Sequence, residues 1–447
     1  MKYSAYPAYK DSGVEWLGEI PEHWEVKRLK YVCSLLRDGT HQPPARVTDG
    51  IPLLSVRNIV DGQFINLDDD SLISEKDFKE LERSFKVKKD DVLLAIVGAT
   101  LGKVAVVGKM PPFAIQRSLA VMRPRLEILN FKFLYFFLVS SEFQKLLWKN
   151  VGFSAQPGIY LGALGNFHIT LPDIKEQLAI ASFLDRETAK IDALIAKKER
   201  LIELLQEKRT AIISHAVTKG LDPSVPLKDS GVEWLGEIPR HWNIIKLGRL
   251  CNVTKLTGFE YTKFWKTDLE GDIIALRGLN IKNNRLILDD IERISSDLSN
   301  QLFRSKLFAG DIVFPCTGTI GNGALIEEDN KFHINQNIAK ITPGAKLNSN
   351  FILYVLISQN MRYQISLLNA SDFQPVLLIG TIRDIRLQIP PKIEQDSIAD
   401  WLDRKTSQID ALINKTHTSI EQLKEYRTAL ISAAVTGKID VRNEVAS

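Results

Sequence analysis

The sequence contains few cysteines and no long apolar run. It has three cysteines among 447 residues, and their spacing does not form a zinc site. Cys33 and Cys251 are 218 residues apart, at matching places in the repeat described below, and we interpret them as small buried side chains rather than as a disulfide. No segment approaches the roughly 18–20 apolar residues of a membrane span, and residues 1–9 lack the apolar core of a secretory signal. We therefore expect a cytoplasmic protein.

Motifs of catalysis are also missing. The segment Gly98–Lys103 has three residues between its glycines and a valine after its lysine, whereas a phosphate-binding loop needs four residues and then Ser or Thr. Its counterpart, Gly318–Asn322, has no lysine, so we interpret both as glycine-shaped turns between strands. The Asn-Pro-Pro-aromatic motif of amino-group methylation and the His-Glu-x-x-His metal motif do not occur. We expect no catalytic residue and no metal site.

A perfect internal repeat is present instead. Lys10–Pro21 and Lys228–Pro239 share the twelve residues KDSGVEWLGEIP at an offset of 218, and a His-Trp pair follows each copy one residue later. Repetition of this kind indicates a chain built from two similar units. No carboxylate or nucleophile accompanies His23 or His241 within the motif, so we expect each histidine to make a structural hydrogen bond.

The two copies become similar again near their C-terminal ends. Residues 176–218 contain no Pro or Gly, which predicts one long helix, and residues 394–436 repeat the pattern. Leucine and isoleucine recur at heptad spacing, which predicts that the helices pack against each other. The residues of this apolar stripe are Leu184, Ile191, Leu194, Ile195, Leu201, Ile202, Leu205 and Ile212 in the first helix and Leu402, Ile409, Leu412, Ile413, Ile420, Leu423 and Leu430 in the second.

The bodies between these repeated ends differ in sequence. Short apolar runs such as Asp91–Val97 and Val104–Val107, separated by Gly, Asn and Asp, predict mixed α/β structure. The net charge of +4 resides mainly in the bodies, since residues 25–171 carry 20 basic against 15 acidic side chains and residues 243–389 carry 17 against 14. A mildly basic body permits nucleic acid as a partner.

The tandem layout, the Ser-Gly-Val-Glu-Trp-Leu-Gly-Glu-Ile-Pro-x-His-Trp openings and the Glu-Gln…(Phe/Trp)-Leu-Asp-Arg…Ile-Asp-Ala-Leu-Ile helices resemble the specificity (S) subunit of type I restriction-modification systems. The resemblance covers essentially the whole chain. It implies an α+β fold with two α/β target-recognition domains in tandem, separated by two long helices that form an antiparallel coiled coil with pseudo-twofold symmetry. The expected segments are 1–172, the first target-recognition domain; 173–219, the first long helix and central spacer; 220–228, a linker; 229–390, the second target-recognition domain; 391–438, the second long helix and C-terminal spacer; and 439–447, a tail.

The resemblance also implies partners. Such a subunit binds double-stranded DNA at a bipartite asymmetric target and docks two methyltransferase (M) subunits, through which restriction (R) subunits join. S-adenosylmethionine, ATP and Mg²⁺ then belong to the partner subunits, and this chain needs no cofactor. Symmetry supports the same division, because two identical M subunits need equivalent surfaces whereas different half-sites need different readers. The residues expected on the partner or scaffold surface are Trp16, Trp24, Trp234, Trp242, Arg186 and Arg404.

We therefore place the DNA readers in the divergent bodies. Arg suits guanine, and Asn or Gln suits adenine, in the major groove. The candidates for base contact are Arg57, Asn58, Gln116 and Arg117 in the first body and Arg277, Asn280, Asn335 and Gln336 in the second. The candidates for phosphate contact are Lys88, Lys89, Lys103, Lys263 and Lys266. An ordinary surface or turn role remains open for each.

Two other functions stay open at this point. The first is a self-sufficient nuclease or methyltransferase with duplicated DNA-binding modules, which would turn over substrate without M subunits. The second is a structural coiled-coil adaptor without DNA affinity, which DNA binding that weakens steeply with salt would exclude.

Overall fold

The computed structural model describes residues 3–152, 157–282, 284–368 and 376–444. The chain forms two compact units, of which the first comprises residues 1–198 and 417–447 and the second residues 199–416. There are two long helices, α6 (Ile174–Lys219) and α13 (Lys392–Val435). One end of each helix belongs to the first unit and the other end to the second. Within the described ranges, no helix is long and apolar enough to cross a membrane.

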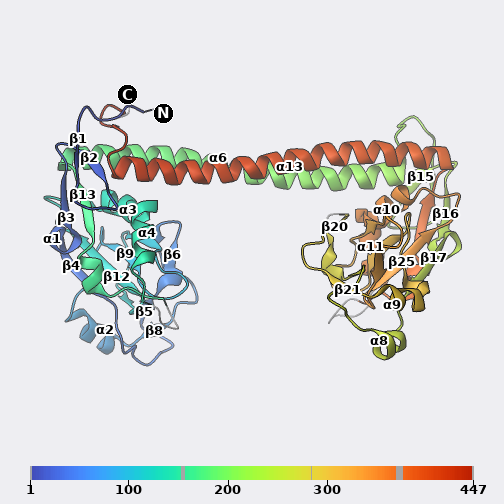
Figure 1. The fold of residues 1–447 in the computed structure, drawn as a ribbon, viewed down its shortest axis with the longest axis horizontal. Coiled ribbons are helices and arrows are strands. Elements are labelled where there is room, and N and C mark those ends of the chain that lie inside the picture. The colour runs from blue at the N-terminus through green and yellow to red at the C-terminus, as the bar shows by residue number, and fades with distance from the viewer. Residues whose placement is uncertain (1–2, 153–156, 283, 369–375, 445–447) are drawn as a thin grey trace. The chain divides into compact units, whose positions relative to one another are not determined.

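The first unit is built on a six-stranded sheet with the order β4-β12-β9-β10-β7-β6 (Figure 1). Its strands are β4 (Cys33–Asp38), β6 (Ile59–Val60), β7 (Gln63–Phe64), β9 (Val92–Ala95), β10 (Val104–Val107) and β12 (Leu119–Pro124). A three-stranded sheet contains β11 (Ala114–Ile115), β5 (Ile51–Leu54) and β8 (Leu72–Ile73) in that order. Two further sheets have two strands each: β1 (Tyr9–Asp11) pairs with β2 (Glu19–Pro21), and β3 (Glu25–Arg28) pairs with β13 (His168–Leu171). The helices are α1 (Leu29–Val32), the 3₁₀ turn η1 (Val56–Asn58), α2 (Glu75–Glu82), α3 (Phe131–Val139), α4 (Ser141–Lys149) and α5 (Leu161–Gly165).

Strand β9 lies at the centre of the first unit's core. Val92 and Leu94 belong to a cluster that includes α3, while Leu93 and Ala95 belong to a second cluster on the other face. All four are fully buried, which explains why this strand is an unbroken apolar run instead of an alternating one.

The second unit repeats this plan with smaller sheets. Its strands are β17 (Cys251–Lys255), β25 (Ile338–Pro343), β22 (Ile312–Pro315) and β23 (Ala324–Leu325) in one sheet; β21 (Glu292–Ile294), β18 (Ile273–Leu276) and β24 (Phe332–Ile334) in another; and the pairs β14 (Leu227–Asp229) with β15 (Glu237–Pro239), β16 (Asn243–Lys246) with β26 (Arg386–Ile389), and β19 (Ile281–Lys282) with β20 (Arg285–Leu286). Its helices are α7 (Leu247–Leu250), α8 (Gly258–Phe264), η2 (Gly278–Asn280), α9 (Ser296–Gln301), η3 (Phe303–Ser305), α10 (Ser349–Ile357), α11 (Gln359–Leu368) and α12 (Ile379–Asp384).

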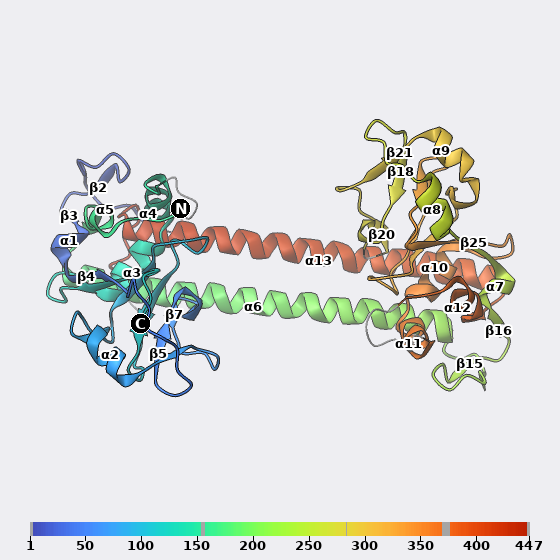
Figure 2. The same ribbon diagram turned by 90° about the horizontal axis from the view of Figure 1, so that it is seen from below.

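Within each unit the two long helices lie side by side and run in opposite directions (Figure 2). In the first unit Arg427 of α13 donates to Asp192 of α6 at 2.8 Å, and in the second unit Arg209 of α6 donates to Asp410 of α13 at 2.9 Å. The 218-residue offset relates the two ion pairs. The same Arg–Asp contact therefore occurs twice, once with the arginine on α13 and once with the arginine on α6. The predicted antiparallel pairing is confirmed.

The predicted apolar stripe is only partly right. Leu184 and Ile191 are buried, but Leu194 and its counterpart Leu412 are 43% and 52% exposed, and Leu201 is exposed as well. One neighbouring helix and one body cover a limited width of each helix, and these leucines lie outside it.

A buried glutamine ties each body to its helix. Gln177 of α6 accepts a hydrogen bond from the Asn130 amide at 2.8 Å, and Gln395 of α13 accepts one from the Asn348 amide at 2.9 Å. The two asparagines cap the N-termini of α3 and α10 with their side chains. The repeated glutamine therefore fixes where α3 and α10 begin.

The twelve-residue repeat forms the same hairpin twice. Tyr9 pairs with Pro21 in β1 and β2, and Leu227 pairs with Pro239 in β14 and β15, in the same register. Gly18 and Gly236 have φ of +61° and +65°, a backbone region that other residues rarely adopt. Backbone geometry thus accounts for part of the identity between the two copies.

The cysteines and the glycine turns agree with the sequence analysis. Cys33, Cys251 and Cys316 are free and buried, and burial raises the pKa of Cys33 and Cys251 to about 12. Gly98 and Gly102, with φ of +88° and +91°, shape the turn between β9 and β10. The turn interpretation of Gly98–Lys103 is confirmed.

Candidate nucleic-acid interface

Two predicted base readers turn out to be structural. Asn58 is fully buried; its side-chain oxygen accepts from the Ser55 amide at 2.9 Å and its NH₂ group donates to the Ile65 carbonyl at 3.0 Å. Asn280 is buried in the same way, accepting from the Arg277 amide at 2.9 Å and donating to the Ile287 carbonyl at 2.9 Å. Neither amide can meet a base edge without breaking these bonds. Base contact by Asn58 and Asn280 stays a prediction, while in this structure both act as internal caps, a role that a short polar side chain near a turn fills equally well.

The arginines beside them are neutralised by carboxylates. Arg57 is exposed, but it donates to Asp69 at 2.6 Å and to Asp70 at 3.0 Å. These hydrogen bonds hold the pKa of Asp69 below its usual value. Arg277 contacts Asp290 at 2.9 Å and Glu292 at 3.2 Å. A phosphate or base would have to displace these partners, so both arginines are weaker candidates than the sequence suggests.

The second group of candidates lies at the ends of central strands. Gln116 and Arg117 follow β11 and precede β12, and Asn335 and Gln336 stand between β24 and β25. Arg117 is exposed, Gln116 and Gln336 are half-buried, and Asn335 is buried. The structure assigns no hydrogen bond or ion pair with a described residue to the side chains of Arg117 and Gln336. The same holds for Gln116 and Asn335, so three of the predicted base readers that are not buried, Gln116, Arg117 and Gln336, remain free to bind a ligand.

An open cavity of about 430 Å³ adjoins Arg117. Its lining comes from segments far apart in the sequence, namely the end of β4, the residues after β9, and the residues before α5. The lining residues include Asp38, His41, Val97, Arg117, Ile159 and Tyr160. Sequence reasoning missed Tyr160, because a lone tyrosine directly before a short helix gives no periodic signal.

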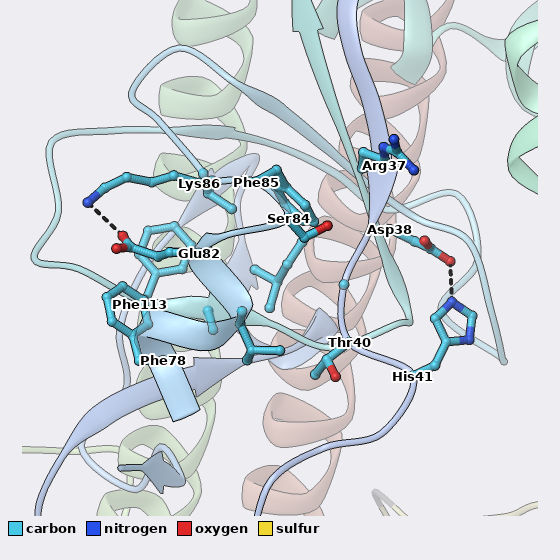
Figure 3. Close-up of a pocket in the computed structure, with 15 residues that line it drawn as sticks. Arg37, Asp38, Thr40, His41, Phe78, Glu82, Ser84, Phe85, Lys86 and Phe113 are labelled. Atoms are coloured by element: carbon cyan, nitrogen blue, oxygen red, sulfur yellow. Dashed lines mark hydrogen bonds and ion pairs between the residues drawn. The ribbon is translucent and has the colours of Figure 1, made fainter. Parts of the chain in front are cut away.

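A second cavity, of about 240 Å³, lies across the segment Asp38–His41 (Figure 3). Figure 3 shows the rings of Phe78, Phe85 and Phe113 on one side of it and Arg37 with the His41–Asp38 pair, 2.7 Å apart, on the other. Asp38 and His41 line both cavities, so the segment that ends β4 borders each of them.

The predicted phosphate contacts are all exposed. Lys88 and Lys89 line a cavity of about 180 Å³ together with Lys109, which the sequence analysis did not select. Lys103 follows the glycine turn, and Lys263 of α8 lies over the rings of Phe259 and Phe264 at 5.2 Å from each centroid. Lys266 follows α8. The two units thus present their lysines from different elements.

The histidines of the repeat bind the long helices. His23 lies 2.9 Å from Glu176, and His241 lies 2.7 Å from Glu394, measured from Nε2 to a carboxylate oxygen. The expected structural hydrogen bond is confirmed, and its acceptor comes from the helix 153 residues away.

The residues expected on a partner or scaffold surface divide into two groups. Trp24 and Trp242 are fully buried and belong to the scaffold, and Trp16 and Trp234 pack partly buried against the cores. Arg186 donates to the Glu444 carbonyl at 2.7 Å. Arg404 is exposed, which leaves it available to a partner.

No group of three or more His, Cys, Asp and Glu side chains among the described residues is placed to hold a metal ion. We assign no metal centre to the described ranges of either unit.

Comparisons with known proteins agree with the twofold plan. The family described as "Type I restriction modification DNA specificity domain" matches the chain twice, at residues 21–204 and 239–422. The specificity subunit of the type I restriction enzyme MjaVIII from Methanocaldococcus jannaschii is 25% identical, over 95% of this chain and 95% of its own length. That of EcoKI from Escherichia coli K12 is 22% identical, over 94% of this chain and 90% of its own length.

Solved structures show a similar fold. A chain from a study of complex assembly and conformational transition in a type I restriction-modification system aligns with a TM-score of 0.65 at 17% identity, covering 93% of this chain and 98% of its own. The HsdS subunit from Thermoanaerobacter tengcongensis aligns with a TM-score of 0.53 at 15% identity, covering 94% of this chain and 98% of its own. At these identities the likeness concerns the fold alone.

Proposed function

Since this chain belongs to the family of type I restriction-modification DNA specificity subunits, we propose that each of its units reads one half of a bipartite, asymmetric DNA target and that the chain docks two methyltransferase subunits. Restriction subunits would join through the methyltransferase subunits. Because the target is DNA, the site of action would be the cytoplasm.

One observation carries this proposal: the contacts that join the two long helices are repeated, whereas the residues free to contact a ligand are not. The Asp192–Arg427 and Asp410–Arg209 pairs are the same contact at an offset of 218 residues. At the matching positions after β11 and β24, by contrast, the first unit has Arg117 and the second has Gln336. A repeated framework suits a partner that binds twice, and different free side chains suit two different half-sites.

We further propose that the chain itself is not catalytic. S-adenosylmethionine would bind to the methyltransferase subunits, and ATP and Mg²⁺ would serve the restriction subunits. The chain's own contribution would be to position those subunits at a chosen adenine.

Mapping of methylated adenines tests the proposal. We expect cells that contain this chain and its methyltransferase subunits to methylate adenines within two short defined sequences separated by a spacer of constant length and arbitrary sequence. Deleting the gene for this chain should abolish that methylation. Methylation that persists after the deletion, or a single undivided target, would contradict the proposal.

An assay of the purified chain alone tests its lack of catalysis. Incubation with S-adenosylmethionine, and separately with Mg²⁺, should give neither methylated nor cleaved DNA. Turnover in either reaction would favour the self-sufficient enzyme. Binding to DNA should weaken steeply with salt, which a coiled-coil adaptor without DNA affinity would not show.

The long helices supply a further test. We propose that the length of α6 sets the distance between the half-sites. Removal of one turn from α6 should therefore change the spacer length in the methylation map and leave both half-sites as they were. A change of half-site sequence with an unchanged spacer would contradict this role.

A further inference from the structure

Two of the free side chains, Arg117 and Gln336, occupy the same position in the two units. Equivalent backbone hydrogen bonds fix the register: Ile96 N to Ser118 O at 2.9 Å in the first unit, and Cys316 N to Asn337 O at 2.8 Å in the second. Arg117 and Gln336 each stand one residue before the accepting carbonyl. The two side chains therefore start from equivalent backbone positions.

A second pair of residues is equivalent by the same reasoning. Ile96 follows β9 and Cys316 follows β22, and the carbonyl of each accepts a backbone hydrogen bond from the segment before a short helix. The bonds run from Ile159 N to Ile96 O at 3.0 Å and from Leu377 N to Cys316 O at 2.8 Å. The next residue in each case is Tyr160, which is 85% exposed, or Leu378, which is 66% exposed. They stand at the N-terminal ends of α5 and α12.

Both segments are thus bonded to one residue in each unit, Ile96 or Cys316. The N–H of that residue holds the segment with the polar side chain, and its carbonyl holds the segment with the apolar one. We name Arg117 with Tyr160 the first reading pair, and Gln336 with Leu378 the second reading pair. In the first unit both members line the open cavity of about 430 Å³.

The charge of the first reading pair is uncompensated. No described carboxylate pairs with the Arg117 guanidinium, whereas Asp69 and Asp70 bind Arg57. An exposed tyrosine ring and an unpaired cation that line one cavity suit the edge of a base pair, where hydrogen-bond acceptors lie next to apolar ring atoms.

We propose that the two reading pairs select different bases, guanine through Arg117 in the first half-site and adenine through Gln336 in the second. This inference rests on the proposed function. A guanidinium donates two hydrogen bonds to O6 and N7 of guanine, and a carboxamide both accepts from N6 and donates to N7 of adenine. Tyr160 and Leu378 position these groups by apolar contact with the neighbouring nucleotide.

The experiment is selection of bound DNA from a library randomised in both half-sites, with the chain in complex with its methyltransferase subunits. Wild type should select guanine at one position of the first half-site and adenine at one position of the second. Arg117→Ala should lower the preference for that guanine by about 5- to 150-fold, the range expected for one bidentate contact, and leave the second half-site unchanged. Arg117→Gln should move the preference from guanine to adenine, and Gln336→Arg should move it from adenine to guanine.

Arg57→Ala is the matched control, because Arg57 is exposed but already paired, and it should leave base preference unchanged. Circular dichroism and thermal unfolding establish that each variant is folded. If Arg117→Ala weakens binding to all sequences equally, or leaves the first half-site as in wild type, the assignment of the reading pair is wrong while the proposed function stands. If the wild-type complex selects no bipartite sequence at all, the proposed function itself fails.

Discussion

At two further contacts, the first and second units attach their bodies to the long helices through the same helix residues but through different body residues. The Ser432 hydroxyl accepts from the Ser141 amide at 2.9 Å, and its counterpart Ser214 accepts from the Gln359 amide at 3.0 Å. The helix side of each contact is identical, while the body side offers a backbone N–H that any residue except proline supplies. The bodies can therefore diverge without losing their attachment.

A second contact follows the same rule. The Val435 carbonyl accepts from the Thr170 hydroxyl at 2.6 Å, whereas the Val217 carbonyl accepts from the Gln388 amide group at 2.8 Å. The acceptor is backbone on the helix, and the donor is whichever polar side chain the body provides. The comparison teaches that sequence identity is needed only where a side chain makes the contact.

The units differ at the glutamate that begins each long helix. Glu176 accepts from the Tyr6 hydroxyl at 2.8 Å, and burial together with this carboxylate raises the pKa of Tyr6. Glu394 instead accepts from Trp242 Nε1 at 3.1 Å. The counterpart indole of Trp24 has no partner among the described residues. In the first unit Tyr6, from the segment before the repeat, thus donates the hydrogen bond to the helix glutamate. In the second unit Trp242, which directly follows the repeat, donates it.

The largest expected effect concerns the buried glutamines. Besides the Asn130 amide, Gln177 binds the carbonyls of Ile128 and Pro172, so Gln177→Ala would leave three buried backbone groups unpaired and should cost about 3 kcal/mol of unfolding free energy. Gln395→Ala, which would leave the Asn348 amide and the Pro390 carbonyl unpaired, should cost about 2 kcal/mol. Urea unfolding followed by circular dichroism measures both.

Gln206→Ala on the exposed side of α6 serves as the control and should change the unfolding free energy by less than about 0.5 kcal/mol. If the loss of unfolding free energy in Gln177→Ala or Gln395→Ala is no larger than in the control, these bonds do not stabilise the attachment of body to helix within each unit.

The next effect separates the two buried tryptophans. Trp242→Phe would remove a hydrogen bond to a carboxylate and should cost about 1.5–3 kcal/mol. Trp24→Phe would change packing alone and should cost about 1 kcal/mol. Thermal unfolding of the two variants, with Trp148→Phe as an exposed control, provides the measurement. Equal losses at Trp24 and Trp242 would remove this difference between the units.

The smallest effect is a pH dependence in the second unit. His333 is fully buried, and burial, aided by Lys340 and Lys306, lowers its pKa. Since the unfolded chain binds the proton near pH 6.5 and the folded chain does not, stability should be intact above that pH and fall below it, by up to about 1.4 kcal/mol per pH unit. Comparing unfolding at pH 7.5 and pH 5.5 measures the loss.

The first unit has Ala114 at the place of His333, as their matching strand pairings show. His333→Ala therefore gives the second unit the residue of the first and should reduce the difference between the two pH values. An unchanged difference would assign the acid sensitivity to other groups.

The sequence predicted the long helices better than it predicted which side chains are exposed. Absence of proline and glycine over residues 176–218 predicted α6, because a long uninterrupted helix needs no tertiary information to be recognised. The exposure of Leu194 was not predictable in the same way, since heptad spacing marks a stripe but not how wide a neighbour covers it. The burial of Asn58 and Asn280 was not predictable for a related reason, because burial of a polar side chain depends on what folds over it.

The sequence by itself determined that this protein is one unit written twice, with two long helices and divergent bodies, because repetition and the absence of helix breakers are properties of the linear chain. Only the tertiary structure decided which polar side chains are free. Arg57 and Arg117 look equivalent in the sequence, yet one is bound by two aspartates and the other borders an open cavity next to Tyr160. Whether a charge is paired depends on carboxylates brought near it by the fold, and sequence spacing does not record that distance.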